Sequence, residues 1–268
     1  MSTDRPAAKD YLGLHLRDLP YFRGLLRAVE ARFYENIELP APTLDLGCGD
    51  GHFATIAFDR KLEVGLDPWT GPLREAAQRG SYQIAVQGAG NRLPFADGTF
   101  ASAVSNSVLE HIPDLDAVLK DIARVLQPGA PFVFCVPNHN FLPELSIARF
   151  FERFSWVKAA ECYRRFFNRI SRHHHCDDPE VWKARLDQTG FEIVRWWHYF
   201  SPKALAVLEW GHYLGLPSLV SRVIFGRWIL ARSAWNLALT RAIVEPYYRE
   251  TGEQPRGAYS FYIARRKR

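Results

Sequence analysis

The sequence predicts an α/β fold built on a mostly parallel sheet. Short apolar segments alternate with segments of helical spacing over residues 41–138. A glycine-rich turn follows the first apolar segment. Residues 131–137 are apolar at nearly every position, which is typical of a strand covered on both faces. Repeated strand, helix and strand units form parallel sheets with right-handed crossovers. The chain has 268 residues, 47% of them hydrophobic, which is enough to fill one large core.

Each element of the first half follows from a local pattern. Apolar residues at helical spacing, Leu25, Val29 and Phe33 among them, predict a helix over residues 20–34 that ends before Pro40. Short apolar runs predict strands at residues 43–46, 62–66, 82–86, 100–106 and 131–137. The segments between them predict helices at residues 52–59, 73–79 and 116–126.

The second half predicts fewer regular elements, separated by long segments. A helix is expected at 179–188, and strands are expected at 191–200 and 258–266. This leaves residues 139–178 and residues 201–257 without a place in a minimal sheet. Both segments are rich in apolar residues at helical spacing, so we expect them to be helical insertions.

Composition and charge narrow the class of protein. The 8 Trp, 11 Tyr and 18 Phe residues exclude a disordered chain. The four cysteines (Cys48, Cys135, Cys162 and Cys176) form no CxxC pair, which predicts a reduced, cytoplasmic protein. The first residues, MSTDRPAAKDYLG, contain no apolar run, so neither a secretory signal nor a membrane anchor is expected. Residues 1–137 carry 13 basic and 17 acidic side chains, whereas residues 138–268 carry 21 and 12, so the two halves are expected to meet different surroundings.

The glycine-rich turn, residues 45–51 (DLGCGDG), is the first candidate binding site. Glycines there allow positive φ and close approach of a ligand, and the helix that follows offers unpaired N–H groups. A dinucleotide-binding turn would require a glycine where this chain has His52. Asp45 favours a ligand with an ammonium group, and Asp67 can accept hydrogen bonds from two ribose hydroxyls. A ribose and an ammonium group without a phosphate describe S-adenosylmethionine.

Four stretches in sequence order resemble the motifs of class I S-adenosylmethionine-dependent methyltransferases. They are LDLGCGDG, EVGLDPW, LPFADGTFASAVSNSVLEHI and RVLQPGAPFVFCVPN. The similarity is strongest to the small-molecule group that carries a D-x-G-x-G-x-G loop. It covers about residues 43–138, with a weaker match at 189–194. It implies a Rossmann-like sheet of seven strands in the order 3-2-1-4-5-7-6, and S-adenosylmethionine as the cofactor.

The same resemblance implies which residues contact the cofactor. The methionine part would lie at Asp45 and the glycine turn, the ribose at Asp67, and the adenine at residues 88–90. The expected cofactor-binding residues are Asp45, Gly47, Cys48, Gly49, Asp67, Pro68, Gly88, Ala89, Gly90 and Asn106.

The chain departs from the family pattern at two positions. Ala89 stands where the family commonly has an aspartate that accepts a bond from the adenine amine. Losing such a bond costs on the order of 1–3 kcal/mol if the amine is buried without another partner. Ala101 stands where an acidic residue is usual. These departures place the adenine contacts in doubt and motivate one alternative, a cofactor-binding partner subunit without catalytic activity.

The expected organisation is a single domain over residues 1–268. An N-terminal helical segment (1–40) precedes a cofactor-binding core (41–138), and two cap insertions (139–178 and 201–257) follow. Strands five and six end at the edge of the sheet where the cofactor binds. Both insertions should therefore emerge over the active site and form the acceptor cavity and its lid.

The apolar cap predicts a small apolar or amphipathic acceptor, methylated on oxygen. A second alternative is a lipid or isoprenoid-linked acceptor at a membrane surface, because basic and aromatic residues alternate over residues 149–172. A nucleic-acid acceptor is disfavoured, since no separate binding module is visible. The sequence makes no prediction of the oligomeric state.

Histidines are the expected proton acceptors. An oxygen acceptor loses a proton as it is methylated, and His111, His139 or His174 is expected as the general base. The run His173-His174-His175-Cys176 raises the question of a metal. Consecutive histidines cannot all face one ion, so no metal site is predicted.

Overall fold

A computed structural model describes residues 9–268, apart from the side chains of Leu216 and Ala234. Residues 1–8 lie outside the described part. The expectation about an N-terminal signal or anchor and the first part of the segment 1–40 fall on those residues.

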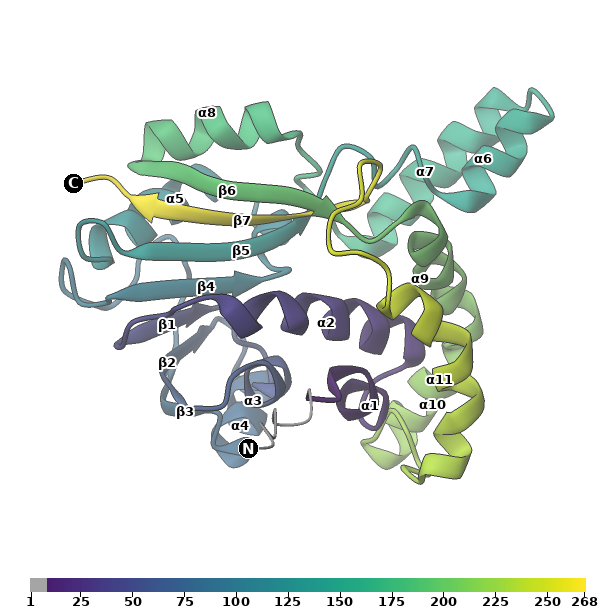
Figure 1. Cartoon of the computed structure of the whole chain (residues 1–268), viewed down its shortest axis with the longest axis horizontal. Helices are drawn as coiled ribbons and strands as arrows, with labels where there is room; N and C mark the ends of the chain where they lie inside the picture. The colour runs from purple at the N-terminus through teal and green to yellow at the C-terminus, as the bar shows by residue number, and fades with distance from the viewer. Residues whose placement is uncertain (1–8) are drawn as a thin grey trace, which may run out of the picture.

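A seven-stranded sheet forms the centre of the described chain (Figure 1). Its order, β3-β2-β1-β4-β5-β7-β6, confirms the predicted topology. β7 is antiparallel to both of its neighbours, and the remaining pairs are parallel. The strands are β1 (Thr43–Leu46), β2 (Leu62–Asp67), β3 (Tyr82–Gln87), β4 (Ser102–Asn106), β5 (Pro131–Pro137), β6 (Phe191–Tyr199) and β7 (Tyr259–Arg266).

Helices cover both faces of the sheet, and β5 shows why both faces are apolar. Because side chains alternate along a strand, Phe132 and Phe134 enter one hydrophobic cluster, whereas Val133 and Cys135 enter the other. The first cluster lies beneath α5 (Leu115–Val125) and α8 (Pro179–Thr189). The second lies beneath α2 (Tyr21–Phe33), α3 (His52–Ala57) and α4 (Thr70–Arg79).

The sequence did not predict the short helix α1 (Tyr11–Leu16) as a separate element. Its six residues are too few to show a helical period, and its stability comes from packing. Tyr11, Leu12 and Leu16 are buried, and α1 packs against α2 and α11.

The long segments of the second half form helices at one end of the sheet. They are α6 (Ser146–Arg153), α7 (Val157–Ser171), α9 (Pro202–Leu214), α10 (Leu216–Phe225) and α11 (Ala234–Tyr248). Figure 1 shows them, with α1, beyond the carboxyl ends of the parallel strands. α9 and α11 pack on α2, which therefore lies between the sheet and the cap. Within residues 9–268, no helix combines the length and the apolar character that crossing a bilayer requires.

Candidate functional site

The turn between β1 and α3 is built from three glycines with positive φ. Gly47, Gly49 and Gly51 have φ of 75°, 53° and 70°. A Cβ on Gly47 would collide with the side chain of Val108, and one on Gly51 would collide with Ser81. Gly49 instead faces open space, with nothing within 4 Å of the position of a Cβ. Positive φ favours glycine at all three positions, and the collisions disfavour a side chain further at the first and third, whereas the second leaves room for a ligand.

The N–H groups of this turn are already used within the protein. Gly47 and Cys48 both donate to the carbonyl of Leu66, at 2.8 and 3.1 Å. Gly49 donates to Oδ2 of Asp67 at 2.9 Å, and His52 donates to Oδ1 of Asp50 at 3.1 Å. These bonds engage the turn itself, and the expectation that the following helix offers unpaired N–H groups stays a prediction. Because the N–H groups of Gly47, Cys48 and Gly49 are engaged, the turn suits a ligand that does not depend on them, such as one without a phosphate.

Two buried carboxyl groups flank the turn. Asp67 accepts from the N–H of Gly49 and, through Oδ1, from the N–H of Trp69 at 2.9 Å. Each oxygen keeps a second lone pair for a ligand hydroxyl. Asp45 accepts from the hydroxyl of Tyr82 at 2.6 Å, and burial raises the pKa of its carboxyl to about 6. A cationic ligand would offset the cost of keeping these carboxylates out of water.

Two cavities lie on either side of Gly47. The glycine-turn cavity, of about 360 Å³, is lined by Asp45, the turn itself, and Arg23 and Arg27 of α2. The Asp67 cavity, of about 580 Å³, is lined by Asp67 with Pro68 and Trp69 and by residues 89–91. Because Gly47 and Val108 line both cavities, the two are neighbouring parts of one groove along the carboxyl ends of β1 and β2.

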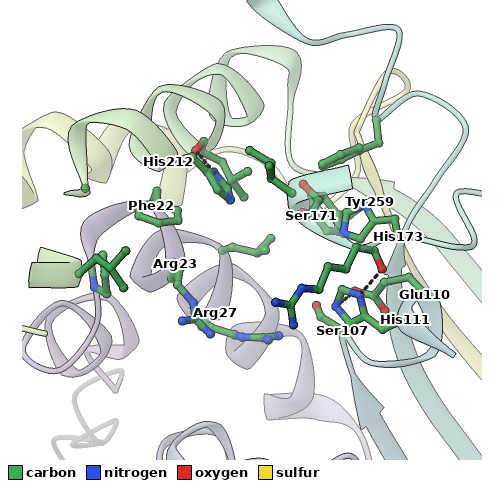
Figure 2. Close-up of a pocket in the computed structure, with 18 of the residues that line it drawn as sticks. Phe22, Arg23, Arg27, Ser107, Glu110, His111, Ser171, His173, His212 and Tyr259 are labelled. Carbon is green, nitrogen blue, oxygen red and sulfur yellow. Dashed lines mark hydrogen bonds and ion pairs between the residues drawn. The ribbon is translucent and has the colours of Figure 1, made fainter. Parts of the chain in front are cut away.

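A third cavity, here called the cap cavity, lies under the helical insertions and has a volume of about 520 Å³ (Figure 2). Both insertions line it, for example through Phe141 and His173 from 139–178 and through His212 from 201–257. It shares Arg23, Arg27, Ser107 and Trp228 with the glycine-turn cavity and shares His111 with the Asp67 cavity. The cap cavity therefore adjoins the groove that runs past the glycine turn.

One wall of the cap cavity gathers Glu110, His111 and His173 (Figure 2). Burial raises the pKa of Glu110 to about 8 and lowers the pKa of His173 to about 3. Burial also lowers the pKa of His111. Nδ1 of His111 lies 3.0 Å from the carbonyl oxygen of Arg172. At neutral pH this wall therefore carries two neutral imidazoles beside a carboxyl group that is reluctant to ionise.

The opposite side of the cap cavity rests on α2, and sequence reasoning missed its polar residues. Glu30 is fully buried and accepts from Arg27 at 2.9 Å, Asn106 at 2.6 Å, Ser107 at 3.0 Å and Tyr199 at 2.8 Å. The signal was present in the sequence, because Glu30 stands next to Val29 on the apolar face of the predicted helix. A charged residue in that position indicates a buried ionic network.

The structure brings together most, though not all, of the predicted site residues. Ala89 and Gly90 line the Asp67 cavity, whereas Gly88 does not, and the N–H of Gly88 donates to the carbonyl of Asp67 at 3.2 Å. Asn106 lines the glycine-turn cavity, although its amide already donates to Glu30.

Of the three candidate bases, His111 lines the cap cavity, whereas His139 and His174 line none of the three cavities. The ring of His139 packs against His198, with centroids 5.5 Å apart. His174 is exposed, and its backbone N–H donates to the carbonyl of Glu110 at 2.7 Å. Its neighbour His173 enters the cavity instead, because consecutive residues of an extended loop face opposite sides.

Comparisons with known proteins agree with this geometry. Residues 44–134 match the family model described as a methyltransferase domain. A malonyl-[acyl-carrier protein] O-methyltransferase of Pseudescherichia vulneris is 36% identical over 107 residues, which are 40% of this chain and 43% of that protein. A ubiquinone/menaquinone biosynthesis C-methyltransferase of Rubrivivax gelatinosus is 28% identical over 199 residues, which are 68% of this chain and 75% of that protein.

A solved structure extends the likeness to the whole fold. A methyltransferase of Thermotoga maritima that depends on S-adenosylmethionine aligns with a TM-score of 0.55 at 16% identity, over 92% of this chain and 91% of that one. At this identity the likeness concerns the fold alone. The chain spans less than half the length of the first curated relatives that it matches.

Proposed function

This chain belongs to the class I S-adenosylmethionine-dependent methyltransferases, and from that premise we propose that it methylates a small molecule held in the cap cavity. The observation that carries the proposal is the junction of the cavities. Arg23, Arg27 and Ser107 line both the glycine-turn cavity and the cap cavity. A ligand along the glycine turn and a second molecule under the cap would therefore lie in adjoining cavities.

The residues present fit S-adenosylmethionine. When bound, this cofactor supplies a methyl group activated by a sulfonium centre. Asp67 would accept from the ribose hydroxyls, and Asp45 would pair with the ammonium group. Arg27 would be the partner of the carboxylate, because it lines the same cavity. The engaged N–H groups of the turn and the pair of buried carboxylates favour this cationic ligand over a dinucleotide.

The chain's own contribution to the reaction would be alignment and the exclusion of water. The cap cavity is lined by apolar side chains from both insertions, which would hold an apolar or amphipathic acceptor against the groove. We propose an oxygen atom as the methylated atom, since the polar wall of Glu110, His111 and His173 suits a hydroxyl group. The curated relatives carry names of both O- and C-methyltransferases, so they do not select the atom.

Binding and turnover can test this function with one conservative variant. Calorimetry of the full chain with S-adenosylhomocysteine should give saturable binding. Asp67→Asn should weaken it at least tenfold, because the ribose loses a charged acceptor. Incubation with S-adenosylmethionine and fractionated hydroxylated metabolites should release S-adenosylhomocysteine in an acceptor-dependent way. Tight binding without turnover on any fraction would instead support the non-catalytic partner subunit.

A second candidate function is methylation of a lipid-linked acceptor at a membrane surface. Phe150, Phe154 and Trp156 are more than half exposed and pack on one another, with centroids 5.1 and 5.8 Å apart. They lie where α6 meets α7, the end of the cap that projects away from the sheet in Figure 1. Arg149 and Arg153 lie beside them and are also exposed. Such a tip suits insertion into an anionic bilayer surface.

Vesicle sedimentation separates this candidate from a freely diffusing acceptor. The chain should pellet with phosphatidylglycerol vesicles, and replacing Phe150, Phe154 and Trp156 by serine should abolish pelleting. Ile84→Ser is the matched control, because Ile84 is equally exposed on β3, away from the cap. If the unmodified chain stays in the supernatant, the membrane candidate is wrong.

A further inference from the structure

Three side chains with metal-binding atoms converge on the polar wall of the cap cavity. Glu110 and His111 are consecutive residues at the end of the short 3-10 helix after β4, and His173 lies in the loop that follows α7. One ligand atom from each of the three lies within 4.8 Å of the other two. Figure 2 shows the three side chains together at one side of the pocket. The fold therefore joins two segments that are far apart in the sequence.

The carboxyl group of Glu110 lacks the partners that a buried acid requires. Glu110 is 2% exposed, and its Oε2 has no hydrogen-bond partner among the described residues. Arg27, the nearest guanidinium of α2, donates to Glu30 and to the carbonyl of Asn106 instead. Leaving a buried acceptor unsatisfied costs about 1–3 kcal/mol, and more for a charged group. A ligand that supplies positive charge at this point would remove that cost.

The imidazole of His111 presents a lone pair to the same point. Its Nδ1 lies 3.0 Å from the carbonyl oxygen of Arg172, and a carbonyl can only accept, so Nδ1 carries the hydrogen. In the neutral ring, Nε2 is then a bare acceptor, 3.7 Å from Oε1 of Glu110. An ionised Glu110 would repel this lone pair unless a cation lay between the two atoms, and a cation there would favour the ionised carboxylate. Two ligand atoms on one ion, each about 2.1 Å from it, are separated by about 3.0–3.4 Å.

His173 completes the group from the other segment. Its ring lies 5.3 Å from the ring of His111, centroid to centroid, and packs edge-on against Phe141 at 4.9 Å. Nδ1 of His173 is 3.7 Å from Sγ of Cys176, a contact that fixes the ring on its outer side. Partners of this kind orient the ligands of metal sites. The ring therefore has little freedom to turn away from Glu110 and His111.

We propose that Glu110, His111 and His173 bind one divalent first-row transition-metal ion, with its remaining coordination positions open to the cap cavity. Two imidazole nitrogens and one carboxylate favour such an ion, whereas Mg²⁺ and Ca²⁺ prefer oxygen ligands. Three protein ligands with open positions are typical of sites that bind a second molecule. The ligand that would occupy these open coordination positions is an oxygen atom of the acceptor molecule.

The assignment of the open coordination positions to an oxygen donor of the acceptor rests on the proposed function, whereas binding of the ion itself does not. If the acceptor is a hydroxyl compound, its O–H bond breaks when the oxygen binds the ion, and the proton passes to water. The oxygen then carries the negative charge that the ion stabilises. In this arrangement His111 holds the ion rather than taking the proton itself.

Cobalt(II) is the probe for the site, because its visible absorption reports on its ligands. The full chain, freed of metal by a chelator, should bind one Co²⁺ per chain by calorimetry and develop visible absorption bands. Glu110→Gln and His173→Ala should each weaken binding at least tenfold. His174→Ala is the matched control, since it removes a histidine of the same run that is exposed and outside the group, and it should leave the affinity unchanged.

Several results would overturn the metal site. The first is the absence of saturable Co²⁺ binding, and the second is full Co²⁺ affinity in His173→Ala. The third is an equal loss of affinity in His174→Ala, which would mean adventitious binding by exposed histidines. Binding of S-adenosylhomocysteine by each variant serves as the folding control.

The same titrations separate this inference from the proposed function. Binding of Co²⁺ without binding of S-adenosylhomocysteine would support the metal site and refute the methyltransferase proposal. Binding of S-adenosylhomocysteine without binding of Co²⁺ would refute the metal site and leave the methyltransferase proposal intact. Acetohydroxamate, an oxygen donor, should shift the cobalt bands if coordination positions face the cavity. An unchanged spectrum would refute the open positions.

Discussion

Buried acidic residues near the glycine turn affect the stability of the folded chain. Asp45 is 5% exposed and Asp67 is 6% exposed, and both stand beside the glycine turn, whereas Glu30 is a buried residue of α2. Buried carboxylates usually lower stability unless they are paired. Glu30 is paired within the protein, whereas Asp45 lacks a cationic partner among the described residues and would gain one on ligand binding.

The raised pKa of Asp45 predicts a pH dependence with opposite effects on stability and binding. The folded chain holds a proton on Asp45 up to about pH 6, whereas the unfolded chain releases it near pH 4. The free energy of unfolding should therefore fall by about 2–3 kcal/mol as the pH rises from 4 to 6. Asp45→Asn keeps the bond from Tyr82 and should abolish this part of the pH profile, measured by urea unfolding.

The same variant should weaken S-adenosylhomocysteine binding at least tenfold at pH 7.5, because the ammonium group loses its carboxylate. Adenosine lacks the amino-acid part and is the control ligand, whose affinity should not change. In the unmodified chain, the affinity for S-adenosylhomocysteine should decline as the pH falls below 6. Equal losses for both ligands would contradict the assignment of Asp45 to the ammonium group.

Substitution of Glu30 should affect stability rather than ligand binding, because all of its hydrogen-bond partners lie within the protein. Glu30→Ala leaves Arg27 without its buried partner and frees the bonds to Asn106, Ser107 and Tyr199. Breaking a buried ion pair in this way should cost about 3–5 kcal/mol in the free energy of unfolding. Glu38→Ala, at an exposed position just beyond the helix, should change it by less than about 0.5 kcal/mol. Similar small effects in both variants would show that the network adds no stability.

At the level of elements, α2 is the piece that joins the sheet to the cap. Its apolar face packs on the sheet, and α9 and α11 pack on the same helix. Gly211 of α9 lies tightly against Phe22 of α2, where a Cβ on Gly211 would overlap the Phe22 side chain. The absence of a side chain at Gly211 therefore sets the distance between cap and core.

Gly211→Ala should force α9 away from α2. Overpacking of this kind costs about 1–3 kcal/mol, although alanine is the better helix former. Gly71→Ala in α4 is the matched control, because nothing lies within 4 Å of its added Cβ, and it should be neutral or slightly stabilising. Thermal unfolding of both variants measures the difference. A Gly211→Ala variant as stable as the control would mean that the two helices are free to shift.

At the level of the whole molecule, the cap is also joined to the core across the glycine-turn cavity. Nη2 of Arg222 in α10 lies 2.8 Å from Oε1 of Glu75 in α4, and both residues line that cavity. Trp228, which follows α10 in the cap, also contacts the core: its ring centroid lies 5.6 Å from Cζ of Arg23. Both charged side chains of the ion pair are more than a third exposed, so the pair is weak and can open and close.

Arg222→Ala should therefore change ligand exchange more than stability. We expect the free energy of unfolding to change by less than about 1 kcal/mol. The dissociation rate of S-adenosylhomocysteine, measured by stopped flow, should rise severalfold because the cap no longer closes over the cavity. Arg227→Ala is the control, as an exposed arginine of the same segment. An unchanged dissociation rate would show that the ion pair does not close the cavity.

The sequence by itself determined the sheet and the glycine turn. The β1–β5 strands and the turn at 45–51 were predictable because strand periodicity and turn glycines are local properties of the backbone. The choice of Asp45 and Asp67 as binding residues followed from their positions at strand ends, and it stays a prediction until a ligand is measured. Local patterns also predicted two helical insertions, but they could not say which of their side chains face inward.

Only the tertiary structure decided which distant residues meet. The partnership of Glu30 with Tyr199, the entry of His173 rather than His174 into the cap cavity, and the closure of Arg222 on Glu75 join residues far apart in the chain. No local pattern encodes such contacts, because they depend on how helices pack over the sheet after it has formed. The physical reason is that backbone preferences act over a few residues, whereas burial and charge pairing act across the whole fold.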